Sequence, residues 1–346
     1  MMVEKVTSLQ VAERAGVSQS AVSRVFTPGA SVSQKTVDKV RKAAAELGYR
    51  PNVLARAMVS GKSRIIGLVV AYLDNYFYPE ALEILSNELQ EKGYHVLVFM
   101  ASQTAGNIDA VVEEILDYQV DGIVTASVAM SSDLSRTCRQ AGVPVVHFNR
   151  FEDSHGVSSV TSDNFAGGRE LAQFLVAGGH QKIAYIAGWE GASTQRDREA
   201  GFRAGLAEQG HALFAHGVGE FDVDHARAAA NAMFSVKPDD RPDAVFVAND
   251  HMAFAVMDEL RFGLGLRIPE DVSVVGFDDV PPSAWRAYDL TTMRQRANLM
   301  VAETVDALLA HIGNPREAAT RQVAIPAPLI IRGSARVPDT WPPQEG

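Results

Sequence analysis

The sequence VTSLQVAERAGVSQSAVSRVF, residues 6–26, has the features of two short helices joined by a glycine. Thr7 or Ser8 can cap the first helix, Gly16 can end it, and Ser18 can cap the second. Ser and Thr are favoured at such places because their side-chain oxygens accept hydrogen bonds from the first N–H groups of a helix. The stretch therefore predicts two helices with a tight turn between them.

The turn has the residue types that a helix-turn-helix needs. Two helices that cross closely require a small side chain at the contact, a residue tolerant of positive φ in the turn, and an apolar anchor in the second helix. Ala12, Gly16 and Val22 stand at those places. A third helix is predicted between Ser33, its expected cap, and Gly48, its expected end. The first fifty or so residues thus form a three-helix domain.

The second helix is expected to enter the major groove of DNA by its first turn. Gln19 can then bond an adenine edge, Arg24 can reach a guanine or a phosphate, and the Ser18 hydroxyl suits a phosphate. The alternative is that Gln19 and Ser20 are ordinary solvated helix surface. The residues of this domain expected to contact DNA are Thr7, Ser18, Gln19, Ser20, Arg24 and Ser33.

The charges favour the DNA-binding interpretation. The chain of 346 residues has a net charge of -10, but residues 1–64 hold eleven Lys and Arg against four Asp and Glu. The head therefore carries +7 and the remainder -17. Such asymmetry predicts an appended module that binds a polyanion.

A short segment follows the three helices. Pro51 breaks the chain, Asn52 can cap, and residues 53–59 can form two helical turns before Gly61. So short a helix is marginal in water, so a partner must stabilise it. The ending Gly-Lys-Ser resembles a phosphate loop, but the glycine required five residues earlier is Arg56, which excludes nucleotide binding.

Residues 6–26, VSQKTVDKVRKAAAELGYRPN (32–52) and ARAMVSGKS (55–63) resemble the head and hinge of the LacI/GalR (lac-repressor/gal-repressor) family of bacterial transcription regulators. The resemblance implies that the hinge helix folds on operator DNA, pairs with the hinge of a second subunit, and inserts an apolar side chain between base pairs in the minor groove. In the family this inserted side chain is a leucine. Met58 stands at that position here, and a methionine can still act as the wedge. The hinge residues implied to contact DNA or pack beside the wedge are Asn52, Ala55, Arg56, Met58 and Lys62.

From Ile65 onward, short apolar runs alternate with amphipathic stretches of helical length. This alternation indicates parallel sheets covered on both faces, in more units than one sheet usually holds. The expected fold is an N-terminal all-α helix-turn-helix head plus an α/β effector domain of two doubly wound parallel-sheet lobes, with ligand bound outside the carboxyl ends of the strands. The expected strands are residues 65–70, 96–100, 122–125, 143–148, 158–161, 183–187, 244–248 and 272–276.

The body also resembles the family's effector domain, which is itself similar to periplasmic sugar-binding proteins. The matching stretches are residues 162–188, 196–202, 242–261, 268–279 and 290–295. One departure is Asn149-Arg150, where many relatives have an acid followed by Arg, so no carboxylate is expected there. The residues that the resemblance places at the effector are Asn149, Arg198, Phe221, Asn249, Asp278 and Gln295. Tyr72 and Phe77 are expected in the loop after the first strand, where they can close the cleft from the other lobe.

The resemblance implies a helix-turn-helix domain over residues 1–50, a hinge helix and linker over 51–63, and a two-lobed effector and dimerisation domain over 64–340. Lobe 1 is expected to take residues 64–162 and 292–323, and lobe 2 residues 163–291 and 324–340. The tail, residues 341–346, lacks leucine heptads, so a dimer is expected rather than a tetramer.

Several polar residues have simpler interpretations. Asp278 and Asp279 could be a catalytic pair, but adjacent residues of an extended segment point to opposite sides. Asp163 is expected to cap a helix, and His180 and His251 to be hydrogen-bonded structural residues. No metal-ligand spacing, dinucleotide motif or catalytic residue is found, so no cofactor is expected. Cys138 is expected to fill space in a partly buried position. Trp189 and Arg196 are expected near the mouth of the cleft, where contact with the ligand and no contact are both open.

The sequence therefore predicts a homodimeric, DNA-binding repressor that responds to a small effector, a sugar or sugar acid first and a purine or other metabolite second. No secretory signal and no apolar run of about 18 residues is found, which predicts a cytoplasmic protein without membrane contact. The alternative is a solute-binding protein or a sugar-modifying enzyme with the same two lobes. A binding protein would need an export signal and has no use for a basic head, and an enzyme would need a nucleophile or an acid/base pair.

Overall fold

The computed structural model describes residues 6–27, 30–50, 62–101, 105–128, 132–151, 156–314, 317–339 and 341. It divides into two compact units, Met1–Arg64 and Ile65–Gly346. The hinge residues Asn52, Ala55, Arg56 and Met58 lie outside the described residues.

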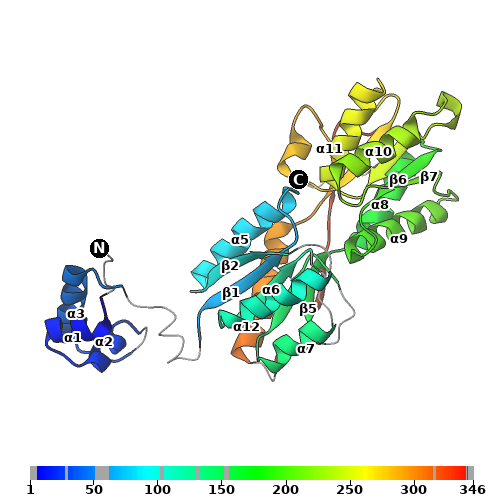
Figure 1. Ribbon diagram of the computed structural model, residues 1–346. Helices are drawn as coiled ribbons and strands as arrows, with labels where there is room; N and C mark the ends of the chain where they lie inside the picture. Colours follow the sequence, from blue (N-terminus) through cyan, green and yellow to red (C-terminus); the bar gives the residue numbers. More distant parts are fainter. Residues whose placement is uncertain are drawn as a thin grey trace. The chain divides into compact units, whose positions relative to one another are not determined.

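The first unit contains three helices, α1 (Ser8–Ala15), α2 (Gln19–Val25) and α3 (Gln34–Leu47) (Figure 1). Thr7, not Ser8, is the cap of α1, and it forms a capping box with Gln10. Gly16 adopts φ 65° at the end of α1, as the predicted turn requires. The small core of this unit consists of Val11, Ala12, Val22, Val40, Ala43 and Ala44.

The first sheet of the body has six strands in the order β11-β5-β4-β3-β1-β2, all parallel. Helices α5 and α12 pack together on one face, and α6 and α7 lie over a second apolar cluster on the other. The strands are β1 (Ile65–Val70), β2 (His95–Met100), β3 (Gly122–Ala126), β4 (Val145–Phe148), β5 (Ser158–Ser162) and β11 (Gln322–Ile325). The helices are α5 (Phe77–Glu91), α6 (Ala105–Asp117), α7 (Ser132–Gln140) and α12 (Ala297–Gly313).

The second sheet has the order β12-β10-β9-β8-β6-β7, with only β12 antiparallel. Figure 1 shows α8 and α9 on one side of this sheet and α10 and α11 on the other. The strands are β6 (Ile183–Ala187), β7 (Ala215–Val218), β8 (Ala244–Val247), β9 (Ser273–Asp278), β10 (Thr291–Arg294) and β12 (Leu329–Ile330). The helices are α8 (Asn164–Ala177), α9 (Ser193–Glu208), α10 (Val223–Phe234) and α11 (Asp250–Asp258), which runs on into a π-helical turn (Glu259–Gly263).

The chain crosses between the two lobes three times, and hydrogen bonds join the crossings to one another. The crossings follow β5, β10 and β11. Asp163 N donates to Ile325 O at 2.8 Å, and Arg294 N donates to Pro328 O at 2.8 Å. Both bonds tie neighbouring crossings together, so the three segments form one connection.

The crossings lie within three residues of the approximate lobe boundaries expected from the sequence. A boundary at 291/292 would cut β10, which pairs with β9 and β12 and belongs wholly to the second lobe. A boundary at 323/324 would cut β11, which pairs with β5 in the first lobe. The crossings therefore lie after Arg294 and after Ile325, because all four residues of each strand pair within a single sheet.

Within the described residues, no helix is both long and apolar enough to cross a membrane.

Candidate functional site

The first turn of α2 is an exposed polar surface. Ser18 caps the helix by accepting from Ala21 N at 3.2 Å, and its hydroxyl lies 3.0 Å from that of Ser20. Gln19 Nε2 donates to Ser8 Oγ at 2.9 Å, which holds the amide against α1. A Gln amide has a second N–H and an oxygen, so this bond orients Gln19 and leaves it able to bond a base edge.

Arg24 lies one turn further along α2. Its side chain is exposed, and its Nε donates to Ser20 O at 3.4 Å. Lys62, at the other end of the head, is also exposed. Both cations are therefore accessible to a phosphate.

Thr7 and Ser33 have structural tasks that are visible in the fold. Thr7 Oγ1 accepts from Gln10 N at 3.4 Å, and Ser33 Oγ accepts from Thr36 N at 3.4 Å. Each side chain caps a helix, as expected. Contact with DNA remains a prediction for both.

In the body, a buried polar cluster lies where the strands of the second lobe end. Asp278, the last residue of β9, accepts hydrogen bonds from Gln295 Nε2 at 2.7 Å and from Arg198 Nη2 at 3.3 Å. Asn75, from the first lobe, donates to the other carboxylate oxygen at 3.2 Å. Asp278 thus joins both lobes at the carboxyl ends of parallel strands, where ligands bind in such folds.

Arg198 is held rigidly on α9. Its Nε donates to Asn164 Oδ1 at 2.8 Å, its Nη1 donates to Ala248 O at 2.6 Å, and its guanidinium lies 3.7 Å from the centre of the Phe277 ring. Helices α8 and α9 pack backbone to backbone above it. A Cβ on Gly201 would lie 2.0 Å from Phe165 O, so only glycine allows this approach. The fork of Arg198 donors is therefore fixed in advance.

Gln295 lies in a crossing between the lobes. Its Oε1 accepts from Ser162 Oγ at 2.9 Å, while its Nε2 serves Asp278. One amide therefore connects two crossings to the buried carboxylate.

The first lobe contributes aromatic and amide groups. Tyr72 lies edge to face with Tyr78 at 5.4 Å, and burial raises the pKa of its phenol above the usual value. Asn149 adopts φ 55° and donates from Nδ2 to Tyr78 Oη at 3.1 Å. Phe77 begins α5 instead of lying in a loop, and it stacks on Phe148 in the core with 3% exposure. The expectation that Phe77 lies in the loop after the first strand is therefore wrong.

Phe221 and Asn249 complete the expected set from the second lobe. Phe221 adopts φ 59°, and its ring covers Gly188 at the end of β6. Asn249 caps α11 by accepting from Met252 N at 3.0 Å, so its oxygen is committed to the helix. A cap at the end of β8 also faces the cleft, and its amide nitrogen is the group that remains for a ligand.

Two buried charged residues were missed by the sequence analysis. Asp250 accepts from Thr292 Oγ1 at 2.6 Å and Ser283 Oγ at 2.7 Å, and burial together with Asp278 raises the pKa of its carboxyl to about 7. Arg150 is 3% exposed and donates from Nη1 to Thr194 Oγ1 at 2.7 Å. The available signal was position, because Arg150 lies two residues after the end of β4 and Asp250 three residues after the end of β8.

Other expectations for polar residues are confirmed. Asp279 points away from Asp278 and pairs with Arg294 and Arg332, each at 2.6 Å, so the two acids are no catalytic pair. Asp163 caps α8, accepting from Ala166 N at 3.0 Å. His180 Nδ1 lies 3.1 Å from Arg336 Nη2 in a structural hydrogen bond. Cys138, by contrast, is fully buried instead of partly buried.

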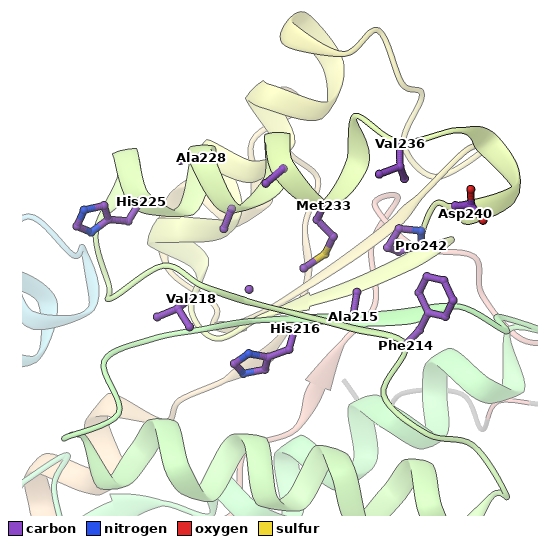
Figure 2. A pocket seen from close by; sticks show the side chains of 13 residues that line it. Phe214, Ala215, His216, Val218, His225, Ala228, Met233, Val236, Asp240 and Pro242 are labelled. Carbon is purple, nitrogen blue, oxygen red and sulfur yellow. The ribbon is translucent and has the colours of Figure 1, made fainter.

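A groove of about 600 Å³ lies elsewhere, along the edge strand of the second sheet. Figure 2 shows α10 running above β7, with Met233 directed into the groove between them. None of the residues expected at the effector lines this groove. It is therefore separate from the Asp278 cluster.

Comparison with known proteins decides the family. A family model described as "Bacterial regulatory proteins, lacI family" matches residues 9–52, and "Periplasmic binding protein-like domain" matches residues 172–335. The HTH-type transcriptional repressor PurR of Vibrio vulnificus is 30% identical over 337 residues, which cover 95% of this chain and 98% of that protein. The chain belongs to the lacI family. It is a DNA-binding transcriptional regulator, and the resemblance noted in the sequence is confirmed.

Other lacI-family proteins agree with this assignment over nearly the whole chain. The sucrose operon repressor of Streptococcus mutans is 30% identical and covers 90% of this chain and 93% of its own. The lac repressor dimer bound to operator and the anti-inducer ONPF has a TM-score of 0.86 at 29% identity, covering 96% and 99%. A complex of the transcriptional regulator CelR with cellobiose has a TM-score of 0.70 at 29% identity, covering 95% and 100%. The predicted fold class and the prediction of a regulator, not an enzyme, are confirmed.

Proposed function

We propose that this lacI-family chain is a homodimeric repressor whose affinity for a near-palindromic operator is controlled by a small effector bound between the two lobes. The observation that carries the proposal is the buried Asp278, which takes donors from both lobes at once. An effector that replaces the Asn75 donor would change the angle between the lobes. The relatives that are repressors, and the solved dimer on operator DNA, support the same function.

The head would bind DNA through α2, with one head on each half of the operator, because a two-fold dimer matches a two-fold site. The hinge, residues 51–63, would pair with its copy and kink the operator centre through Met58. Residues 1–50, 51–63 and 64–340 would then be the DNA-binding, hinge and effector parts. DNA is the partner, so the protein would act in the cytoplasm.

The effector would contact the cleft groups already described. Arg198 offers fixed donors, Asp278 accepts or exchanges hydrogen bonds with hydroxyls, and the flat ring of Phe221 suits a sugar ring. A sugar or a sugar acid is the first candidate, and the cellobiose bound by CelR supports a sugar. The full proposed set is Tyr72, Phe77, Asn149, Arg198, Phe221, Asn249, Asp278 and Gln295.

A mobility-shift assay tests the proposal, using DNA upstream of the protein's own gene with and without candidate sugars. We expect specific binding that at least one sugar changes by severalfold to a hundredfold, since couplings between sites are about 1–3 kcal/mol. The absence of specific binding to any fragment in any ligand state contradicts the proposal.

Arg198→Ala separates the two activities. We expect the variant to bind operator like the wild type and to lose the response to effector, because Arg198 lies in the body and bonds to Asn164, Ala248 and Asp278 there. Gel shifts with an effector titration measure both properties. A loss of operator binding both with and without effector would assign Arg198 to the DNA-binding apparatus.

A further inference from the structure

Within the described residues, Arg150 is a buried cation without a counter-charge. It is 3% exposed, and its Nε and Nη2 have no hydrogen-bond partner in that part of the chain. Its Nη1 reaches two neutral oxygens, Thr194 Oγ1 at 2.7 Å and the carbonyl of Asn149 at 3.5 Å. Among the described residues, no Asp or Glu forms an ion pair with it. A guanidinium in this state is costly to bury, so a site that keeps one is built for an anion from outside.

Asp278 does not supply the missing charge. No ion pair joins it to Arg150 within the described part of the chain, and its oxygens already accept from Arg198, Gln295 and Asn75. The Tyr72 phenol lies near both groups, since Arg150 lowers its pKa and Asp278 raises it, although burial dominates. The acid there is hydrogen-bonded, and the cation has unused donors within the described residues.

The first turn of α9 adds to the positive field. Thr194, the Arg150 partner, is in that turn, and Ala192 at the cap position offers no side-chain hydrogen bond. The N-terminus of this 16-residue helix is buried, with Ser193 and Thr194 at most 4% exposed. An uncapped helix N-terminus carries partial positive charge and binds anions. The Arg150 guanidinium and the N-terminus of α9 are both positive and face each other, so an anion between them would stabilise both.

A second unsatisfied atom indicates what accompanies the anion. Asn149 Oδ1 is buried and has no partner in the described part of the chain, and Asn149 precedes Arg150 directly. An amide oxygen accepts hydrogen bonds, and a hydroxyl group is a suitable donor. The neighbouring atoms thus match a molecule that carries an anionic group and a hydroxyl close together.

We propose that Arg150 binds the anionic group of the effector, with the first turn of α9, and that the effector is an acidic sugar derivative with a carboxylate as the expected group. This inference rests on the proposed function, because it assumes an effector in the cleft. It differs from the earlier expectation by assigning the acidic group to Arg150 and by excluding a neutral sugar. Arg150 becomes the residue that determines specificity.

Thermal unfolding of the full-length chain tests the assignment. The probes are sodium acetate and sodium sulfate against sodium chloride at equal ionic strength, and the matched pairs glucose with glucuronate and galactose with galacturonate. Glucose 6-phosphate distinguishes a phosphate from a carboxylate. The proteins are the wild type, Arg150→Met, Arg150→Lys and Arg203→Met, the last replacing an exposed arginine of α9 that pairs with Glu199.

We expect at least one acid to raise the Tm of the wild type while its neutral partner does not. Arg150→Met should weaken the binding of that acid by about 10- to 100-fold, as expected for the loss of hydrogen bonds to a charged group. Arg150→Lys should weaken the binding less. Without anions, Arg150→Met should unfold at a higher temperature than the wild type, because the uncompensated charge is gone. Arg203→Met should bind the acid like the wild type.

Three results would overturn the proposal: a neutral sugar that binds wild type and Arg150→Met equally, no stabilisation by any acid or anion, or a lower Tm for anion-free Arg150→Met. If Arg150→Met does not fold, Arg150→Lys serves as the test. Acid binding by Arg150→Lys equal to that of the wild type would contradict recognition of the acid by the forked donors of a guanidinium. Operator binding is measured in parallel. Operator binding that responds to a neutral effector would support the proposed function and contradict this inference.

Discussion

Gln19 is the residue on which base recognition should depend most. Gln19 lies on the exposed first turn of α2, and its amide donates a hydrogen bond to Ser8 of α1. The side chain is therefore oriented before DNA binds. We expect Gln19→Ala to cost about 1–3 kcal/mol of operator binding and to relax the preference at one base pair, because one bidentate contact is lost. Fluorescence anisotropy with single-base operator variants measures both effects. Gln34→Ala, on the surface of α3, is the matched control, and an equal loss there would refute the special role of Gln19.

Asp250 should make the stability of the body depend on pH. Its pKa is about 7 in the folded chain, raised by burial and by Asp278, while an unfolded Asp titrates near 3.9. Between these values the folded protein holds a proton that the unfolded chain has released. The stabilisation is therefore complete below about pH 4 and is lost as the pH rises through about 7.

Urea unfolding from pH 4 to 8 checks this sign. Relative to wild type, we expect Asp250→Asn to lose this downward slope in the free energy of unfolding. His147, whose pKa burial lowers to about 4, contributes an opposite slope to both proteins and cancels in the difference. Asp239→Asn, at an exposed position, should keep the wild-type slope. An Asp250→Asn curve parallel to wild type would mean that Asp250 is ionised in the folded state.

Part of the cleft could be predicted from the sequence. Arg198, Asp278 and Gln295 were placed together by the family resemblance, and the structure brings them within hydrogen-bond distance. Arg150 was passed over because a single sequence does not say which arginine lacks a partner. That property depends on the burial and pairing of groups from both lobes.

At the scale of elements, the α8–α9 contact depends on glycine. A Cβ on Gly201 would meet backbone, the carbonyl of Phe165, which cannot rotate away. We expect Gly201→Ala to cost about 1–3 kcal/mol of stability and to weaken effector binding, since Arg198 lies one turn earlier on α9. Gly313→Ala is the control, because a Cβ there meets nothing within 4 Å. Calorimetry with an effector titration measures both, and equal behaviour of the two variants would contradict the steric argument.

The strands that the sequence analysis omitted have at most four residues each. Strand β7 (Ala215–Val218) is a four-residue edge strand with alternating exposure, and it includes a histidine and a glycine. Strand β12 has two residues. The largely buried strands β1 and β6 were predicted to the residue, because a continuous apolar run of five or six residues is typical of a buried strand. Pairing with neighbours, which a sequence does not display, defines the edges.

For the whole molecule, the unequal charge should appear as salt dependence. We expect the +7 head to make the phosphate contacts, and each contact contributes about 0.9 to the log–log slope of affinity against salt. We expect Lys62→Ala to weaken all DNA sequences alike and to reduce the slope by about 1. Lys237→Ala, on the body, should leave the slope unchanged. Filter binding at several salt concentrations provides the slopes, and a sequence-dependent effect of Lys62→Ala would contradict a phosphate contact.

The three bonded crossings also have a consequence for synthesis on the ribosome. The first sheet obtains its last strand, β11, from residues 322–325, after every strand of the second sheet except β12 has been made. Helix α12, which covers the first sheet, comes almost as late. The lobe that emerges first therefore cannot finish folding until most of the other has emerged, and β5 presents an unpaired edge while residues 163–321 are synthesised. Protection of that edge in the nascent chain, by a chaperone or by rapid synthesis, becomes a requirement of the fold.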